Sequence, residues 1–298
     1  MKILLTGKDG QVGRRLQRTL APLGEVVAVG REVVDLAQPD SIVRTVRAVK
    51  PDLIVNAAAY TAVDKAESEP DLAHAINAVA PGIMAEEAGR LGAAIVHYST
   101  DYVFDGKKAS PYDESDSPDP TGVYGRTKLA GEQAVQAVGA PYLILRTSWV
   151  YDCSGKNFLL TILRLAHDRE ELKVVDDQTG APTSSPLIAN LTAQILQGGN
   201  PVELLRHQGG LYHLTASGQT TWYGFARAIV EGDPRRDKQR LQRLLPITTE
   251  EYPTAARRPA YSSLNCAKLS GTFGLSLTEW QVGLGQVFQD MSSNTEVN

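Results

Sequence analysis

The chain of 298 residues carries 30 basic and 34 acidic side chains, so its formal net charge is −4. Hydrophobic residues make up 42% and charged residues 21%, a globular composition that argues against disorder in a chain long enough to bury a sizeable core. The slight acidic excess gives no general basic surface, so we expect no nucleic-acid partner.

The N-terminus does not read as a signal peptide, and no apolar run approaches the roughly 18 residues that suggest a membrane span. The two cysteines, Cys153 and Cys266, cannot form a disulfide framework and are expected to be reduced thiols. We therefore expect a cytoplasmic protein without a membrane partner.

The first half of the chain alternates short apolar segments with longer helical patterns. In chain order, these patterns predict strands at 2–6, 25–29, 52–56, 94–98 and 142–146, and helices at 11–21, 41–49, 72–91 and 127–138. Short apolar strands separated by helices are typical of a parallel sheet covered on both faces. The predicted fold class is therefore α/β, a doubly wound parallel Rossmann sheet.

In the second half of the chain, predicted strands and helices alternate less regularly. This half predicts helices at 158–167, 186–197 and 221–230, a strand at 210–215, and a frayed tail from Ser292. We expect residues 1–150 to form the Rossmann domain, with later segments returning to the sheet. Residues 151–298 are expected to form mainly a smaller C-terminal lobe.

A glycine-rich turn, Gly7-Lys-Asp-Gly-Gln-Val-Gly13, lies between the first predicted strand and the first helix. Gly7 permits positive φ, Gly10 leaves room for a pyrophosphate, and Gly13 lets the helix lie close to the strand. The helix start then offers unpaired N–H groups to the anion. The strand–turn–helix context predicts a dinucleotide site at Gly7, Gly10, Gln11, Val12 and Gly13 rather than ordinary loop glycines.

The type of dinucleotide is indicated by the end of the second predicted strand. An acid there would bind the ribose diol of NAD, but the sequence reads Val29-Gly-Arg31. Arg31 could pair with the 2′-phosphate of NADP, whereas Glu32 or Asp35 could still bind a diol. We predict that NADPH is preferred and that NADH is possible.

A tyrosine and a lysine, Tyr124 and Lys128, stand four residues apart, so on a helix they share one face. A phenol is a poor acid at neutral pH, and a neighbouring ammonium would favour the phenolate. Such a pair also occurs by chance on helix surfaces. Lys128 could in addition hydrogen-bond the ribose of a nicotinamide.

The fourth predicted strand is followed by Ser99, Thr100 and Asp101. The carboxyl end of a central strand faces the ligand crevice, so Thr100 could donate a hydrogen bond to a substrate carbonyl oxygen. A hydroxyl at this position is also commonly a turn or cap residue. The order of glycine turn, hydroxyl and Tyr/Lys pair favours catalytic roles for Thr100, Tyr124 and Lys128.

These features resemble the extended short-chain dehydrogenase/reductase family, and within it the dTDP-4-dehydrorhamnose reductases over essentially the whole chain. The resemblance rests on the segments at 7–13, 55–67, 97–104, 123–132, 146–151, 177–183 and 210–214 and on Arg258-Pro259. It implies NAD(P)H-dependent reduction of the C4 ketone of dTDP-4-dehydro-6-deoxy-L-mannose to dTDP-L-rhamnose. A C-terminal lobe would bind the nucleotide sugar.

The resemblance also implies further binding residues. The coenzyme would be held in addition by Asp35, Leu36, Ala57, Ala58, Ala59, Tyr60, Thr61 and Tyr98, together with Tyr124 and Lys128. The substrate would contact Thr100, Asp101, Trp149, Gln178, Thr183 and Arg258. In each case the ordinary alternative, such as a core tryptophan for Trp149 or a surface arginine for Arg258, stays open.

One departure from the family concerns metal. Some relatives dimerise around a magnesium ion held by glutamates, one of them just past the glycine turn. This chain reads Gly13-Arg-Arg-Leu16 there, and Ser185-Pro186 replaces an acid further on. Hard cations need oxygen ligands, so we predict no metal and either a monomer or a metal-independent homodimer.

Two rival functions fit the same motifs. A nucleotide-sugar dehydratase or epimerase shares the scaffold, but the dehydratases carry an Asp-Glu pair after the strand-end threonine, and here Tyr102 follows Asp101. A non-catalytic NADP-binding regulator, like the methionine adenosyltransferase β subunit, shares the segment at 99–104. Retention of Thr100, Tyr124 and Lys128 together favours an enzyme.

Overall fold

A central six-stranded parallel sheet organises the protein. The computed structural model describes the backbone of residues 1–295 and the side chains through residue 293. In the sheet order β10-β5-β4-β3-β1-β2, the strands are Gly210–His213, Tyr142–Thr147, Ala94–Thr100, Leu53–Asn56, Lys2–Thr6 and Glu25–Val29. Every neighbouring pair is parallel, which confirms the predicted doubly wound α/β class.

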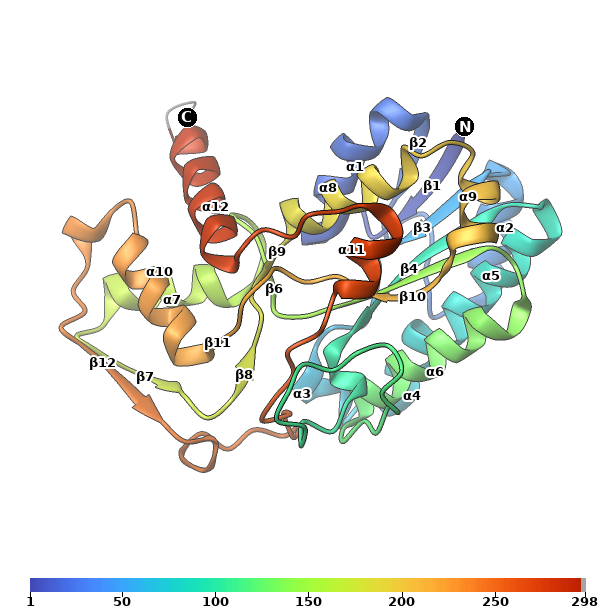
Figure 1. Cartoon of the computed structure of the whole chain (residues 1–298). Helices are drawn as coiled ribbons and strands as arrows, with labels where there is room; N and C mark the ends of the chain where they lie inside the picture. Colours follow the sequence, from blue (N-terminus) through green and yellow to red (C-terminus); the bar gives the residue numbers. More distant parts are fainter. Residues whose placement is uncertain (296–298) are drawn as a thin grey trace.

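Helices cover both faces of this sheet (Figure 1). One face packs against α1 (Gln11–Leu20) and α8 (Ser185–Leu196), with α9 (Pro201–Gln208) and α11 (Ala267–Phe273) completing the layer. The other face packs against α2 (Pro39–Val49), α5 (Ala80–Leu91) and α6 (Val123–Val138). Because both faces are covered, the strands read as continuous apolar runs in the sequence.

The chain order reverses between β1 and β3, which lie side by side in the sheet. In open α/β sheets, ligands bind at such a switch point, outside the carboxyl ends of the strands. Here Thr6, Asn56 and Thr100 end β1, β3 and β4. The fold therefore collects these three polar residues at one edge.

Two predicted helices differ from the observed ones. The pattern at 72–91 is a chain of α4 (Pro70–His74), a π-helical turn (Ala75–Val79) and α5, preceded by the short α3 (Val63–Ala66). Helix α6 begins at Val123 rather than at 127, because extended backbone at Gly122 ends the preceding loop. Tyr124 consequently lies in the first turn of α6, with Lys128 one turn later.

The smaller lobe has its own apolar core. It is formed by α7 (Phe158–Asp168), α10 (Trp222–Gly232) and α12 (Trp280–Thr295), which pack around Phe225 and Trp280. Beside them, β7 (Glu171–Val175) pairs in parallel with β12 (Arg243–Ile247). Short pairs join β8 (Thr179–Gly180) to β11 (Thr220–Thr221), and β6 (Val150–Tyr151) to β9 (Thr183–Ser184).

The chain crosses more than once between sheet and lobe (Figure 1). The strand predicted at 210–215 is β10, which extends the main sheet beside β5. The division at residue 150 stays a prediction. Helix α12 runs through Ser292 to Thr295, so the fraying expected from Ser292 is not seen there, and residues 296–298 lie outside the described part.

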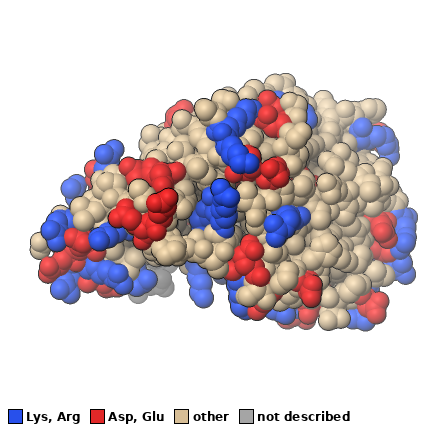
Figure 2. Space-filling view, turned by 90° about the horizontal axis from the view of Figure 1, so that it is seen from below, with Lys and Arg blue, Asp and Glu red and all other residues tan. Residues whose placement is uncertain are grey.

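Charge is mixed over the face shown in Figure 2, where Lys and Arg side chains alternate with Asp and Glu. This face therefore offers no continuous basic surface. None of the helices within residues 1–295 combines the length and the apolar character needed to cross a bilayer.

Candidate active site

The glycine turn has the close packing that its sequence predicts. Gly7 adopts φ of +74°, and a Cβ there would lie 2.8 Å from the backbone N of Ala58. At Gly13 a Cβ would lie 2.0 Å from the carbonyl oxygen of Gly7. Gly10 is the N-cap of α1. The turn thus presents backbone N–H groups at a helix start, an arrangement suited to an anion.

A hollow of about 410 Å³ opens beside this turn. Nine of the predicted coenzyme residues line it: Gly7, Gly10, Arg31, Asp35, Leu36, Ala58, Ala59, Tyr60 and Thr61. Val12 instead packs against the core, and Gln11 Oε1 accepts a hydrogen bond of 2.8 Å from Asn157 at the start of α7. The structure therefore brings most of the predicted set around one cavity.

Charged groups at this hollow bear on whether Arg31 would pair with a 2′-phosphate or an acidic residue would bind a ribose diol. Glu32 forms an ion pair of 2.9 Å with Lys8. The Arg31 side chain is 81% exposed and lies 3.9 Å from Asp35. Arg31 and Asp35 thus both line the hollow as partners in one ion pair, while Glu32 is paired with Lys8 and does not line it.

Thr100 and Tyr124 meet at the carboxyl end of β4. The Thr100 hydroxyl donates to Asp101 Oδ1 at 3.1 Å and accepts from the N–H of Tyr102 at 3.2 Å. It also lies close enough to the Tyr124 phenol to lower the pKa of that phenol. Gly125 allows this approach, because a Cβ there would lie 2.1 Å from the carbonyl oxygen of Tyr102. Thr100 is therefore both the turn residue and a partner of the tyrosine.

Lys128 is buried beneath this pair. Its Nζ donates to the carbonyl oxygen of Tyr98 at 2.6 Å and lies 3.3 Å from Nε2 of His97. Burial lowers the pKa of Lys128 to about 8, against the opposing charge of Glu132. Lys128 is thus an unusually labile proton carrier for a lysine.

The expected acidic tyrosine is not what this arrangement produces. Burial raises the pKa of Tyr124 to about 12, and Asp101 acts in the same direction, although the Thr100 hydrogen bond opposes both. The Lys128 ammonium is directed to Tyr98 and His97, so it does not outweigh burial. Tyr124 is therefore held as a neutral phenol, the form that can donate a proton.

Asp101 carries a buried acceptor without a partner. Its side chain is 2% exposed, and Oδ2 makes no hydrogen bond of good geometry to any described residue. Burial raises the pKa of Asp101 to about 6, although the hydroxyls of Ser262 and Thr100 lower it in part. An unpartnered buried acceptor next to Thr100 is a candidate anchor for a ligand hydroxyl.

A second cavity, of about 400 Å³, lies on the smaller lobe beside α7 and β7, where Tyr102 of the turn after β4 reaches it. Gln178, Arg258 and Tyr102 line it together with Phe158 and other apolar side chains. Arg258 reaches it while forming an ion pair of 2.8 Å with Asp64.

Trp149 stands close to this cavity. Its ring stacks on Trp222, a cavity-lining residue, with centroids 3.5 Å apart. Trp149 adopts φ of +46°, a conformation that non-glycine residues rarely take and that often marks functional sites. Two stacked indoles offer a rigid flat surface to a sugar or a base.

Two predicted site residues have other contacts. Thr183 is fully buried, and its hydroxyl bonds to the backbone of Ala181 and Ala216. The Tyr98 phenol shares a hydrogen bond of 2.8 Å with Thr192 on α8, so Tyr98 serves the site through its carbonyl oxygen. The contacts of Thr183 support the fold rather than ligand binding.

Several polar residues around the site were missed by the sequence reasoning. Asn77, in the π-helical turn, bonds to the backbone of Tyr60 and to Thr127. Behind Lys128, Glu132 forms a buried two-bonded ion pair with Arg146. The sequence did offer one signal for such a network, because Asn56 and His97 are polar residues within otherwise apolar strands.

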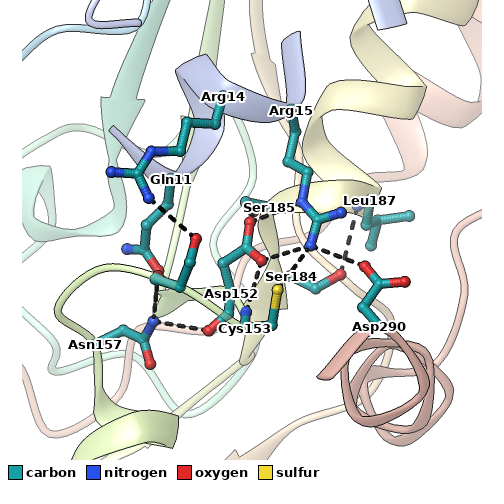
Figure 3. A network of polar contacts seen from close by, with 11 residues as sticks. Gln11, Arg14, Arg15, Asp152, Cys153, Asn157, Ser184, Ser185, Leu187 and Asp290 are labelled. Atoms are coloured by element: carbon teal, nitrogen blue, oxygen red, sulfur yellow. Dashed lines mark hydrogen bonds and ion pairs between the residues drawn. The ribbon is translucent and has the colours of Figure 1, made fainter. Parts of the chain in front are cut away.

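The sheet and the lobe are joined by a polar network (Figure 3). Arg15 of α1 donates to both oxygens of Asp152, at 2.9 and 2.6 Å, and pairs with Asp290 of α12 at 2.8 Å. Arg14 bonds to Ser154 at 3.2 Å. The segment at 13–16, where we expected no metal ligand, thus supplies Arg15, which binds the carboxylates of Asp152 and Asp290. Within the described residues, no cluster of three or more His, Cys, Asp or Glu could hold a metal ion.

The doubly wound sheet, the glycine turn at its switch point and the Thr/Tyr/Lys set at the end of β4 define a nicotinamide-dependent oxidoreductase of the extended short-chain dehydrogenase/reductase class. The family model described as "RmlD substrate binding domain" matches residues 1–293. The chain belongs to this family, that of the dTDP-4-dehydrorhamnose reductases.

Individual relatives agree. The dTDP-4-dehydrorhamnose reductase of Burkholderia thailandensis is 48% identical, with 98% of this chain and 100% of the relative covered. A crystal structure of a dTDP-4-dehydrorhamnose reductase from Clostridium acetobutylicum is 38% identical, with a TM-score of 0.90 and coverage of 98% and 100%. A Bacillus anthracis dTDP-4-dehydrorhamnose reductase in complex with NADP is 34% identical, with a TM-score of 0.87 and coverage of 97% and 99%.

Proposed function

We propose that the chain reduces the C4 ketone of dTDP-4-dehydro-6-deoxy-L-mannose to give dTDP-L-rhamnose, using a reduced nicotinamide dinucleotide. The observation that carries this proposal is the placement of Tyr124, in the first turn of α6, beside the end of β4 that carries Thr100, in a chain that matches the reductase family over residues 1–293. A ketone reduction needs a proton donor placed at the developing alkoxide, and this pair provides one.

The residues at the glycine turn fit the coenzyme. Side chains at Gly7 and Gly13 would clash with the neighbouring backbone, so the turn keeps its N–H groups accessible next to the hollow. The turn would hold the pyrophosphate, and residues 57–61 would lie along the dinucleotide. When bound, the reduced coenzyme supplies a hydride.

The chain's own residues handle the proton. Tyr124 donates its phenolic proton to the oxygen at C4 as a general acid. The Thr100 hydroxyl, whose single proton is donated to Asp101 in the unliganded chain, would turn to donate it to the same oxygen and stabilise its developing charge. Lys128 holds the ribose and provides positive charge below the phenolate that Tyr124 becomes.

The nucleotide end of the substrate is assigned to the cavity of about 400 Å³. Gln178 and Arg258 would contact the nucleotide diphosphate, and Trp149 the sugar. Asp101 Oδ2, which is buried and makes no hydrogen bond of good geometry to a described residue, would accept a hydrogen bond from a sugar hydroxyl. The contacts of Thr183 do not support a direct role for it.

We propose NADPH as the preferred coenzyme, with NADH as a possible substitute. The support is the exposed guanidinium of Arg31 at the mouth of the hollow, together with the pairing of Glu32 to Lys8. Metal independence, a monomer or metal-independent homodimer, and a cytoplasmic location stay predictions.

Replacement of Tyr124 by Phe tests the function. With the keto-sugar nucleotide and NADPH, we expect kcat to fall by roughly 10²–10⁴-fold, the usual contribution of a general acid, while coenzyme binding is retained. Coenzyme fluorescence and the loss of NADPH absorbance measure the two quantities. Unchanged turnover in this variant would overturn the mechanism.

The same assay addresses the rivals. A regulator would bind NADP tightly without turning over the keto sugar. A dehydratase would need a second carboxylate after Asp101, but Tyr102 stands there with its ring packed edge-on against Tyr124, 5.5 Å between centroids.

A further inference from the structure

A row of buried polar side chains leads from Lys128 into the main sheet. His97 on β4 is 0% exposed, and its Nε2 lies 3.3 Å from Lys128 Nζ. Its Nδ1 lies 3.1 Å from Nδ2 of Asn56 on β3, which is 1% exposed. The reaction described above makes no use of either residue.

The direction of the hydrogen bonds along this row is set at its far end. Oδ1 of Asn56 lies 3.3 Å from the backbone N of Ala58 and 2.7 Å from the Thr6 hydroxyl. A backbone N–H can only donate, so the acceptor oxygen of the Asn56 amide must face Ala58. The amide nitrogen then faces His97 and donates to Nδ1.

An imidazole that accepts at Nδ1 and remains neutral carries its proton on Nε2. His97 is neutral, because burial and the adjacent Lys128 lower its pKa well below the usual value. Its Nε2–H therefore points at Lys128 Nζ. A neutral amine can accept this hydrogen bond, but an ammonium cannot, since it has donors only.

We propose that His97 is a positioning residue of the reaction: Asn56 holds its imidazole as the Nε2–H tautomer, and this N–H donates to Lys128 Nζ and weakens the hold of Lys128 on its third proton. The proposal rests on the proposed function for its role in catalysis. Its consequence is that the pKa of Lys128, which burial already lowers, is lowered further by His97.

The other groups around Lys128 do not produce this effect. The titratable or charged side chains on its own helix are Tyr124, Arg126 and Glu132. Those on the elements packed against this helix are Asp64, Lys65, Asp71, His74, Glu86, Glu87, Arg90, His97, Tyr98, Asp101, Tyr102, Tyr142 and Arg146. Glu132 favours the ammonium, but it is already bonded twice to Arg146. The Tyr98 carbonyl oxygen accepts from either form of Lys128.

Nuclear magnetic resonance of the unmodified protein tests the tautomer without any turnover. Long-range proton–nitrogen spectra of histidine-labelled protein distinguish Nε2–H from Nδ1–H rings, and the His97→Gln variant assigns the signal. Above the midpoint of the Lys128 titration we expect the Nε2–H tautomer. An Nδ1–H ring there would overturn the proposal, whatever the enzyme does with its substrate.

A near-isosteric variant should reverse the direction of the hydrogen bonds that join Asn56, His97 and Lys128. In Asn56→Asp, oxygen replaces the donor nitrogen, so His97 must donate from Nδ1 and accept from Lys128 at Nε2. We expect the Lys128 titration, followed on lysine labelled at Cε, to move up by about one pH unit, a tenfold change in proton affinity. The alkaline limb of kcat/KM should move with it, and His97→Gln should shift both in the same direction.

His213→Gln is the matched control, because His213 is an equally buried histidine on β10 that bonds to the Tyr112 carbonyl. It should leave the Lys128 midpoint in place. An unmoved midpoint in both Asn56→Asp and His97→Gln would overturn the proposal. Loss of turnover in the unmodified protein would instead refute the proposed function and leave the tautomer result intact.

Discussion

At the carboxyl ends of β1, β3 and β4, individual side chains are held in protonation states that suit a reduction and lower the stability of the fold. Asp101 shows this most clearly, because its pKa of about 6 lies above its ordinary value of 3.8 and its Oδ2 has no good partner among the described residues. For a carboxyl whose pKa is raised by folding, the ionised form destabilises the native state. This penalty is absent below pH 3.8, grows between pH 3.8 and about 6, and is complete above that.

Replacement of Asp101 by Asn is therefore expected to stabilise the protein at pH 7. The gain should be at most about 3 kcal/mol, from the cost of about two pKa units, and it should vanish near pH 4. Urea unfolding at the two pH values measures it. We expect KM for the keto sugar to rise at the same time, and a loss of stability at pH 7 would contradict the account of Asp101.

Coenzyme choice also belongs to single residues. If Arg31 pairs with the 2′-phosphate, then Arg31→Ala should reduce kcat/KM for NADPH by roughly 10–100-fold, the value of a charge-assisted hydrogen bond. NADH lacks this phosphate, so kcat/KM for NADH in the same variant is the internal control and should change little. A clear NADH preference that Arg31→Ala leaves unaltered is incompatible with this assignment.

At the scale of elements, the site depends on how closely α6 approaches its neighbours. Gly125 brings the helix against the turn after β4, and Gly131 brings it against the π-helical turn. Through these two contacts, Tyr124 reaches Thr100 and Thr127 reaches Asn77. The π-helical turn is consistent with this role, since such turns are frequent at functional sites.

A methyl group at Gly131 would lie 2.0 Å from the carbonyl oxygen of Asn77. We expect Gly131→Ala to destabilise the protein by about 1–3 kcal/mol, as overpacking does, and to lower kcat as α6 shifts. The control is Gly285→Ala in α12, where nothing lies within 4 Å, and it should stabilise by about 0.5–1 kcal/mol. Equal effects of the two substitutions on thermal unfolding would argue against the close approach.

At the scale of the whole molecule, a polar network joins the main sheet layer to the smaller lobe. The network of Figure 3 links α1, which begins at the glycine turn, to Asp152 and to α12. Burial alone would raise the pKa of Asp152, but hydrogen bonds from Arg15 and Ser185 hold it below its ordinary value. This contribution to stability is present above pH 3.8 and is lost as the pH falls through the lowered pKa.

Arg15→Met should leave Asp152 buried without its cation and destabilise the protein by about 3–5 kcal/mol at pH 7. Arg14→Met is the matched control, since this neighbouring arginine makes a single hydrogen bond to Ser154, and it should cost well under 1 kcal/mol. Denaturant unfolding at pH 7 compares the two variants. The difference between them should shrink in acid as Asp152 becomes protonated.

What the sequence determined by itself is local and periodic. Apolar runs located the strands of the main sheet, and the glycine spacing located the tight turn beside the hollow of about 410 Å³, because backbone sterics act within a few residues. The Tyr/Lys spacing likewise placed two side chains on one face of α6. The charge at Arg31 predicts a preference for NADPH, which stays a proposal.

Only the tertiary structure decided how distant segments meet. β7 pairs with β12 across a long stretch of sequence, and β10 returns to the main sheet, pairings that no local pattern encodes. Burial likewise reversed the expected shift at Tyr124 and directed Lys128 to His97, because desolvation depends on everything packed around a group. Proton affinities in this site are therefore a property of the assembled core, whereas the spacing of Tyr124 and Lys128 was enough to predict them as the reacting groups.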